Sequence, residues 1–396
     1  MSKWVLQKAV EFCASVRDGT HDSPKSVEGG GKPLVTSKVV KQGVVRVEDA
    51  YLISEKDYRK INERSKVDRW DVLMTMIGTV GECAIVKDDP DYAIKNIALF
   101  KMAGDEEKAK WLYYYLTSPT GQGALRGNFR GSSQQYISLD QLRNLEVPVP
   151  EKDVRSRIVA ILSDYDSAID NARRQIALLE EAAMRLYREW FDGTGKGWKR
   201  TPVVLADVLE RLGTGLNPRK NFTLGHGENF YVTIKNMANN RVYLDSKCDK
   251  VDDEAIRKIN RRSDLRKGDV LFSGIGTIGR AYLIAEAPKN WNTSESVFNL
   301  RANSRITPEF LYMLMLSSKM QQYAMNNATG CAQKGIRAAA LRAYQFDLAP
   351  LIEIEKFTEQ VRPMLNAVND LNKKIDSLTE ARDRLLPKLM SGEIEV

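Results

Sequence analysis

Residues 269–284, DVLFSGIGTIGRAYLI, have the spacing of a nucleotide-binding loop. Gly274, Gly276 and Gly279 form a G-x-G-x-x-G pattern after an apolar run, and such glycines let a backbone approach a pyrophosphate when a helix opens behind them. The stretch that follows here is apolar and aromatic and begins without an N-cap residue, so it favours a second strand. A nucleotide-dependent enzyme that uses this loop, with NAD or S-adenosylmethionine as ligand, is therefore kept only as an alternative.

Other catalytic patterns are missing from the sequence. His21 and His226 are its only histidines, and neither belongs to an H-E-x-x-H motif or stands near a G-x-S-x-G nucleophile. It has no P-loop and no adenine-methylation motif of the N-P-P-[FY] or D-P-P-Y type. The four cysteines lie far apart, which favours free thiols in a reducing cytoplasm over a zinc site. With no run of 18 apolar residues either, we predict a non-catalytic cytoplasmic chain that holds no metal or cofactor.

The net charge of +8 is unevenly distributed. Residues 151–192 and 351–396 each hold seven Lys/Arg and nine Asp/Glu, so the rest of the chain carries a net charge of +12. Such a basic surface indicates a polyanionic partner, and double-stranded DNA is the partner that we predict. Charge alone leaves open that these residues only keep the protein in solution.

The chain contains an internal repeat. Residues 61–86 align without gaps to residues 259–284, with 11 of 26 positions identical. Further matches flank this segment on both sides: RDGTHDSPK (17–25) with RLGTGLNPR (211–219), VTSK (35–38) with VTIK (232–235), and Gly131 and Gln134 with Gly330 and Gln333. Each copy is a globular region followed by a long helical segment.

The repeat changes the interpretation of the glycine loop. The first copy has Met76 where the second has Gly274, so we predict that Gly274 is incidental. The shared I-G-T-[VI]-G lies between two strand-like runs and predicts a hairpin turn with glycines at positive φ. Thr75 and Ser273, beside the turn, are predicted to contact DNA.

Two long helices form the strongest pattern in the sequence. Apolar residues recur alternately at four and three positions, the heptad spacing of a coiled coil. The positions in the first helix are Ile158, Leu162, Tyr165, Ile169, Ala172, Ile176, Leu179, Ala183, Leu186 and Trp190, and those in the second are Phe357, Val361, Met364, Val368, Leu371, Ile375, Leu378, Arg382, Leu385 and Leu389. Arg382 is the exception to the apolar pattern. Pro363 is expected to kink or delay the second helix, and Pro387 and Gly392 to end it.

We predict that the two helices pair as an antiparallel coiled coil. That arrangement places the globular regions at opposite ends of a rod of about 50 Å. One turn of B-DNA measures roughly 34–36 Å, so both regions could contact the same duplex. The alternatives are that each helix packs on its own region, or that the coiled coil only assembles protein partners and has no DNA role.

Both globular regions are predicted to be α+β. Short β-like runs alternate with Gly/Asn/Asp-rich loops, and helices follow near 106–118 and 307–325. The polar loop residues include Arg, Lys, Asn and Gln, which can bond base edges or phosphates. The predicted DNA contacts are Thr20, His21, Ser37, Lys38, Arg64, Lys66, Thr75, Arg126, Arg130, Ser132, Ser133, Gln134, Gln135, Thr214, Asn217, Arg219, Lys220, Lys235, Asn236, Arg261, Arg262, Ser273, Asn292, Gln333, Lys334 and Arg337.

With these segments in view, the chain resembles the specificity subunit of a type I restriction–modification system, a phage-defence system. The stretches that carry the resemblance are RDGTHDSPK, PLVTSK and RSKVDRWDVLMTMIGTVG in the first copy and TGLNP, IKNM, GDVLFSGIGTIG and TGCAQKGI in the second. The resemblance implies target-recognition domains over 1–150 and 195–350, joined by long helices over 151–194 and 351–396. Each domain would read one half of a bipartite, asymmetric DNA site.

The resemblance also implies partners. The coiled coil would space the two half-sites and dock two methyltransferase subunits, which bind S-adenosylmethionine and methylate adenine. Restriction subunits that use ATP and Mg²⁺ for translocation and cleavage would complete the assembly. The chain itself would recognise DNA and leave the chemistry to its partners.

Overall fold

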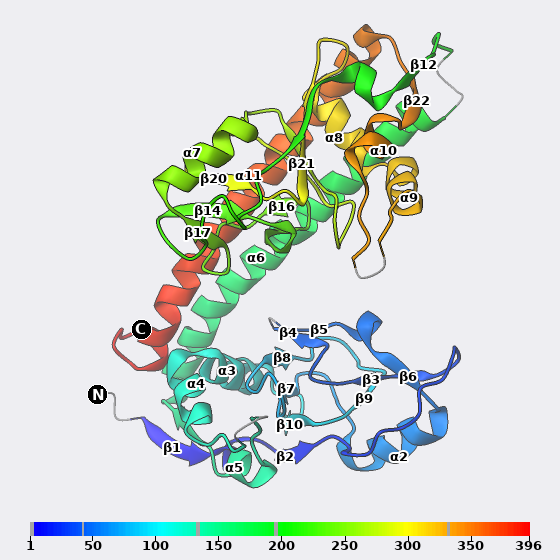
Figure 1. Cartoon of the computed structure of the whole chain (residues 1–396). Helices are drawn as coiled ribbons and strands as arrows, with labels where there is room; N and C mark the ends of the chain where they lie inside the picture. The colour runs from blue at the N-terminus through cyan, green and yellow to red at the C-terminus, as the bar shows by residue number, and fades with distance from the viewer. Residues whose placement is uncertain (1–3, 42, 132–134, 194–196, 331–332) are drawn as a thin grey trace. The chain divides into compact units, whose positions relative to one another are not determined.

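The computed structural model of the chain describes residues 4–41, 43–131, 135–193, 197–330 and 333–396. The chain forms two compact units (Figure 1), the first of residues 1–171 with 375–396 and the second of residues 172–374. The division falls within both long helices, so each unit contains part of each helix. Among the described residues, no helix combines the length and the apolar character that a membrane crossing requires.

The first unit is built on a four-stranded antiparallel sheet in the order β2-β10-β7-β8, beside a three-stranded sheet in the order β6-β3-β9. Its strands are β1 (Val5–Lys8), β2 (Ser15–Asp18), β3 (Lys32–Val35), β4 (Val40–Lys41), β5 (Val44–Val45), β6 (Tyr51–Ile53), β7 (Val72–Thr75), β8 (Cys83–Ile85), β9 (Ala93–Ile94), β10 (Ile97–Lys101) and β11 (Glu146–Val149). Its short helices are α1 (Ala9–Phe12), α2 (Glu55–Ser65), α3 (Glu106–Thr117), α4 (Pro119–Arg126) and α5 (Leu139–Arg143).

The second unit repeats this topology. Its four-stranded sheet has the order β13-β21-β18-β19, and its three-stranded sheet has the order β17-β14-β20. The strands are β12 (Thr201–Val204), β13 (Leu209–Thr214), β14 (Asn229–Val232), β15 (Met237–Ala238), β16 (Arg241–Val242), β17 (Asp249–Val251), β18 (Val270–Ser273), β19 (Ala281–Leu283), β20 (Trp291–Thr293), β21 (Val297–Ala302) and β22 (Gln345–Leu348). The helices are α7 (Asp253–Arg262), α8 (Pro308–Leu316), α9 (Ser318–Asn326) and α10 (Ala338–Arg342). The predicted α+β duplication is confirmed.

The helical stretch expected near 307–325 is two helices, α8 and α9, whereas the one expected near 106–118 is α3 alone, and α4 follows it directly. The break falls at Ser118 in the first unit and at Ser317 in the second. Both serines are buried, and each hydroxyl accepts a hydrogen bond from a backbone N–H in the first turn of the next helix. Such a side-chain cap starts a new helix, and in the second unit it divides the stretch that the sequence pattern suggests as one helix.

The two copies align differently near the first strand of each sheet. Asp18 pairs with Ala98, whereas Thr214 pairs with Phe298, so Gly19 corresponds to Gly215. The sequence alignment of RDGTHDSPK with RLGTGLNPR is therefore wrong by two residues. The misalignment arises because Arg211, Gly213 and Thr214 have the same residue types as Arg17, Gly19 and Thr20, although they lie two positions earlier along the paired strand.

The long helices are α6 (Lys152–Tyr187), which ends in a π-helical turn over Arg188–Asp192, and α11 (Leu351–Met390). All the predicted heptad positions are buried or half-buried. In the first unit the start of α6 packs against the end of α11, through Ile158 and Leu389 among others. In the second unit the end of α6 packs against the start of α11, with the rings of Tyr187 and Phe357 6.1 Å apart. The helices are therefore antiparallel within each unit, as Figure 1 shows.

Arg382, the exception in the heptad pattern, forms an ion pair across the two helices. Its Nη1 lies 2.7 Å from Oδ1 of Asp166, whose other oxygen accepts a hydrogen bond from the Tyr114 hydroxyl at 2.7 Å. The equivalent residues of the second unit are Ala183 and Leu365, which are both buried in one apolar cluster. A single polar pair in an apolar seam favours one helix register over others.

Contrary to expectation, Pro363 does not delay the start of α11 and Pro387 does not end it. The helix continues through both Pro363 and Pro387 and ends at Met390, before Gly392, whose φ is +68°. Proline removes one intrahelical hydrogen bond, but packing of the apolar seam on both sides of it stabilises the helix across the gap.

Candidate nucleic-acid interface

Each four-stranded sheet contains a hairpin whose turn is closed by a buried hydroxyl. In the first unit the Thr75 hydroxyl donates to the Thr79 carbonyl and accepts from the Glu82 N–H at 3.0 Å. In the second, the Ser273 hydroxyl donates to Thr277 O at 2.6 Å and accepts from the Arg280 N–H at 2.8 Å. Thr75 and Ser273 are fully buried, so the prediction that they contact DNA is wrong.

A glutamine side chain lies against the last glycine of each hairpin turn and leaves little room for a larger residue there. Gly81 and Gly279 have φ of +94° and +99°, and a Cβ at either would lie 3.1 or 2.0 Å from the side-chain oxygen of Gln122 or Gln321. Each glutamine donates to the carbonyl of its glycine, at 3.1 and 2.9 Å, and to a second carbonyl at the end of α3 or α8, at 2.7 Å in both units. Because the turn is bonded to the helices in the same way twice, it is a fixed part of the domain.

Gly274 is not incidental. A Cβ at this position would lie 2.2 Å from the Phe298 ring. In the first unit the equivalent residues are Met76 and Ala98, both buried. The same space is therefore filled by the Met76 side chain in the first unit and by the Phe298 ring in the second, and these two residues come from different strands of the sheet. Because the glycine pattern connects two antiparallel strands and opens no helix, the nucleotide-loop alternative is not supported.

Each hairpin holds a second loop by backbone hydrogen bonds. In the first unit Gly78 N donates to Gln135 O at 3.2 Å, and Arg130 and Tyr136 exchange two hydrogen bonds of 2.9 Å. In the second unit Gly276 N donates to Lys334 O at 2.9 Å. There Thr329 and Gly335 exchange the matching pair of hydrogen bonds, both 2.9 Å. We call these segments loop 130–136 and loop 329–335.

The described residues of these loops differ between the units although the backbone contacts agree. Arg130, Gln135 and the 41% exposed Tyr136 correspond to Thr329, Lys334 and Gly335. Equivalent backbones with different exposed side chains are what two readers of different DNA sequences require, since bases are distinguished by side-chain contacts. Tyr136 was missed by sequence reasoning, although its neighbour Gln135 was predicted.

A glycine turn follows the first strand of each four-stranded sheet. A Cβ at Gly19 or Gly215 would lie 2.3 or 1.6 Å from a carbonyl oxygen at the end of β9 or β20. The turn places His21 between Asp18 and Asn96, at 2.9 and 2.8 Å from its two ring nitrogens.

Asn217, at the position equivalent to His21, donates to Glu295 at 2.5 Å. Arg64 and Arg262 bond the carbonyls of the two turn glycines, Gly19 and Gly215, at 3.2 and 3.0 Å. These four predicted contacts therefore also have partners within the domain.

Two more predicted contacts, Asn236 and Asn292, are buried, so the prediction that they contact DNA is wrong. Asn236 accepts from the backbone N–H of Thr233 at 3.0 Å and caps a short helical turn. Asn292 donates to Asn260 Oδ1 at 2.7 Å and to Ser263 O at 2.8 Å, which joins β20 to α7. Both side chains are used within the domain.

The remaining predicted contacts among the described residues are accessible. Ser132, Ser133 and Gln134 lie outside the described residues. The exposed or half-buried ones are Thr20, His21, Ser37, Lys38, Arg64, Lys66, Arg126, Arg130, Gln135, Thr214, Asn217, Arg219, Lys220, Lys235, Arg261, Arg262, Gln333, Lys334 and Arg337. Their accessibility permits DNA contact, and their individual roles stay predictions.

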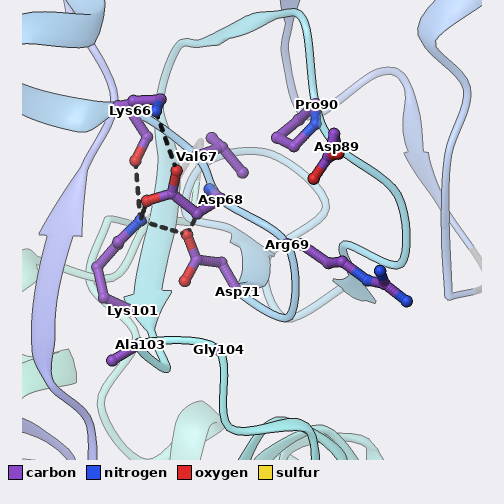
Figure 2. Close-up of a pocket in the computed structure, with 10 residues that line it drawn as sticks. All are labelled: Lys66, Val67, Asp68, Arg69, Asp71, Asp89, Pro90, Lys101, Ala103 and Gly104. Carbon is purple, nitrogen blue, oxygen red and sulfur yellow. Dashed lines mark hydrogen bonds and ion pairs between the residues drawn. The ribbon is translucent and has the colours of Figure 1, made fainter.

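A cavity of about 470 Å³ in the first unit is lined by charged residues, of which Lys66, Asp68, Asp71 and Lys101 are joined by ion pairs (Figure 2). Lys101 Nζ lies 2.6 Å from Asp71 Oδ2, bonds Asp68, and donates to Lys66 O at 3.1 Å. The hydrogen bond from Lys101 lowers the pKa of Asp68, whereas burial raises the pKa of Asp71.

The second unit repeats this ion pair with an arginine. Arg301 contacts both oxygens of Asp269, at 2.7 and 2.8 Å. A charge pair at the same place in both sheets is a structural connection between neighbouring strands.

The cysteines in the described part of the chain are unsuited to nucleophilic chemistry. Burial raises the pKa of Cys13 to about 12 and that of Cys248 to about 11, and it also raises the pKa of Cys83. A thiol acts as a nucleophile only as the thiolate, which these environments disfavour. The described residues also contain no group of three or more His, Cys, Asp or Glu side chains that could hold a metal ion.

Comparisons with known proteins agree with this architecture. The sequence matches the family described as type I restriction modification DNA specificity domain over residues 1–181 and 196–379. The specificity subunit of the type I restriction enzyme MjaIX from Methanocaldococcus jannaschii is 21% identical over 99% of this chain and 94% of its own length. A putative MjaX specificity subunit from the same organism is 22% identical over 82% of this chain and 79% of its own length.

The fold also matches a solved structure. The crystal structure of a type I restriction–modification S subunit from M. genitalium has a TM-score of 0.57 and 14% identity, covering 98% of this chain and 96% of that one. Because the two copies of the domain match the family model separately, the match spans both units. The chain therefore belongs to the type I restriction–modification DNA specificity family, and it is a non-catalytic subunit that recognises DNA sequence.

Proposed function

We propose that the two units read two different half-sites of one asymmetric DNA sequence. The observation that supports this proposal is the pair of loops 130–136 and 329–335, which have the same backbone bonding and different exposed side chains. In this proposal Arg130, Gln135 and Tyr136 contact the first half-site, and Gln333 and Lys334 contact the second. Arg and Lys suit guanine edges, and Gln suits adenine.

The long helices α6 and α11 are proposed to set the spacing between the half-sites and to dock two methyltransferase subunits. Those subunits would bind S-adenosylmethionine and methylate adenine, and restriction subunits would supply the ATP- and Mg²⁺-dependent reactions. This chain would hold no cofactor of its own, and the complex would act in the cytoplasm.

Methylation sequencing of cells that carry the intact system tests the proposal. We expect one bipartite motif with a spacer of fixed length, because the two long helices connect both readers. Exchanging residues 198–350 for those of a relative should change one half of the motif and leave the other half and the spacer unchanged. Methylation without a shared motif, or a change in both halves, would contradict the proposal.

A further inference from the structure

Helices α2 and α7 carry the same pair of exposed cations. Arg59 and Lys60 of α2 correspond to Arg257 and Lys258 of α7, and all four residues are exposed. They lie in the middle of their helices, so the preference of cations for a helix C-terminus does not account for them. Neither pair was among the predicted DNA contacts.

Interior contacts account for most of the other residues that the two helices share. The buried pairs are Ile61 with Ile259 and Ser65 with Ser263. Arg64 and Arg262 bond the carbonyls of Gly19 and Gly215. Exposed residues are freer to diverge after a duplication, so the shared cations point to a contact made outside the domain.

The local partners of these cations are weak or missing. Arg59 pairs with Glu55 at 3.0 Å and Lys258 pairs with Glu254 at 2.7 Å, both one helical turn away on the exposed surface. Lys60 and Arg257 form no ion pair within the described part of the chain. Exposed pairs of this kind contribute little and leave their cations available to another anion.

The second unit places further positive charge beside its pair. Lys258 Nζ contacts the Asn221 carbonyl at 3.5 Å, which brings the segment containing the exposed Arg219 and Lys220 next to α7. In α7 the exposed Arg261 also replaces Glu63 of α2. The surface on α7 is therefore more basic than the one on α2.

The two half-sites of a DNA duplex share one feature, the phosphate backbone, and differ in another, the base sequence. The phosphate backbone is the same in every half-site, whereas the bases differ. We infer that Arg59–Lys60 and Arg257–Lys258 bind DNA phosphates in the same way in both half-sites, while the divergent loops 130–136 and 329–335 contact bases. This inference rests on the proposed function, and it separates residues that supply affinity from residues that supply specificity.

Salt-dependent DNA binding of the full chain tests the inference. Fluorescence anisotropy would measure binding to two duplexes, one with the methylated motif and one with a scrambled sequence. The salt concentration would be varied over roughly 0.05 to 0.3 M, a range in which the release of counterions changes the affinity measurably. Each double variant, R59Q/K60Q and R257Q/K258Q, should reduce the slope of log K against log salt by about 2, since each phosphate contact contributes about 0.9. The corresponding loss of affinity is roughly thirty-fold at about 0.15 M salt for both duplexes, so their affinity ratio should not change.

A matched control removes two exposed arginines that also pair within their own helices. Arg185 with Glu189 and Arg384 with Glu380 form such pairs on α6 and α11. R185Q/R384Q should keep the wild-type salt slope, because the change in net charge is equal but the site differs. Circular dichroism melting should show that all three variants fold.

Two outcomes would overturn the inference alone. One is an unchanged salt slope in both α2 and α7 variants while the wild type binds both duplexes and prefers the motif. The other is a loss of affinity confined to the motif duplex, which would assign these cations to base recognition. A wild-type chain that binds neither duplex would contradict the proposed function itself.

Discussion

The packing of Gly274 against Phe298 predicts a strong coupling between two substitutions. Gly274 does not have a positive φ, so lack of space for a side chain is what requires glycine there. The first unit has Met76 and Ala98 at the same two positions. Each unit thus combines one small and one large residue, on opposite strands.

The size of the coupling follows from the costs of the single changes. Phe298 is 6% exposed, so Phe298→Ala should leave a cavity and destabilise the second unit by about 3–5 kcal/mol. Gly274→Met places its Cβ in the Phe298 ring and should cost at least about 1–3 kcal/mol. Independent effects would add to about 4–8 kcal/mol. G274M/F298A recreates the combination of the first unit and should cost less than about 2 kcal/mol, a coupling of at least about 2 kcal/mol.

Urea unfolding of the four proteins in this cycle measures the coupling. Hydrogen exchange of the amides of β18 and β21 would assign the loss to the second unit, where both residues lie. The reciprocal pair in the first unit, M76G/A98F, is the matched control and should show the same sign. A double variant as unstable as the sum of its single variants would refute the reasoning that these two positions share one space.

Three further predictions concern charged and thiol groups. Arg301→Ala should lower the free energy of unfolding by about 3–5 kcal/mol in urea titrations, because it leaves the buried Asp269 carboxylate without its cation; a loss below about 1 kcal/mol would show that water replaces the pair. Arg382→Ala should lower the free energy of unfolding by about 1–3 kcal/mol, since it leaves the half-buried Asp166 carboxylate without its cation. Adding Asp166→Leu, which matches Leu365 of the second unit, should recover most of that loss in thermal unfolding. Cys13 should resist thiol reagents at about pH 8 in the folded chain and react when unfolded, as its pKa is raised to about 12. A raised thiol pKa stabilises the fold below the ordinary value of about 8.5, and this contribution is lost as the pH rises towards 12.

The spacing of apolar residues and the comparison of the two halves of the sequence were sufficient to predict the architecture. The heptad spacing from Ile158 to Trp190 identified α6, and its recurrence after 199 residues identified α11. The hairpins were identified because glycines that need positive φ recur between the same strand-like runs. These signals are local, and the burial of one helix face or one turn conformation is enough to produce them.

The individual DNA contacts were harder to predict. Thr75, Ser273, Asn236 and Asn292 have the right chemistry for DNA, but they lie inside the domain and saturate backbone groups there. The sequence around a polar loop residue does not distinguish one that binds a DNA phosphate from one that binds a carbonyl inside the domain. Burial depends on what packs over it, and that is decided by residues far away in the chain.

The sequence by itself determined the duplication, the two long helices, the turn glycines and the DNA-recognising family. The tertiary structure alone decided that Gly274 makes room for Phe298, that Arg382 pairs with Asp166, and that Gln122 and Gln321 hold the hairpins. These contacts join residues 24 to 216 positions apart, and no local pattern encodes them. Repeating patterns reveal which elements form, whereas close packing between elements decides which side chains remain free to contact DNA.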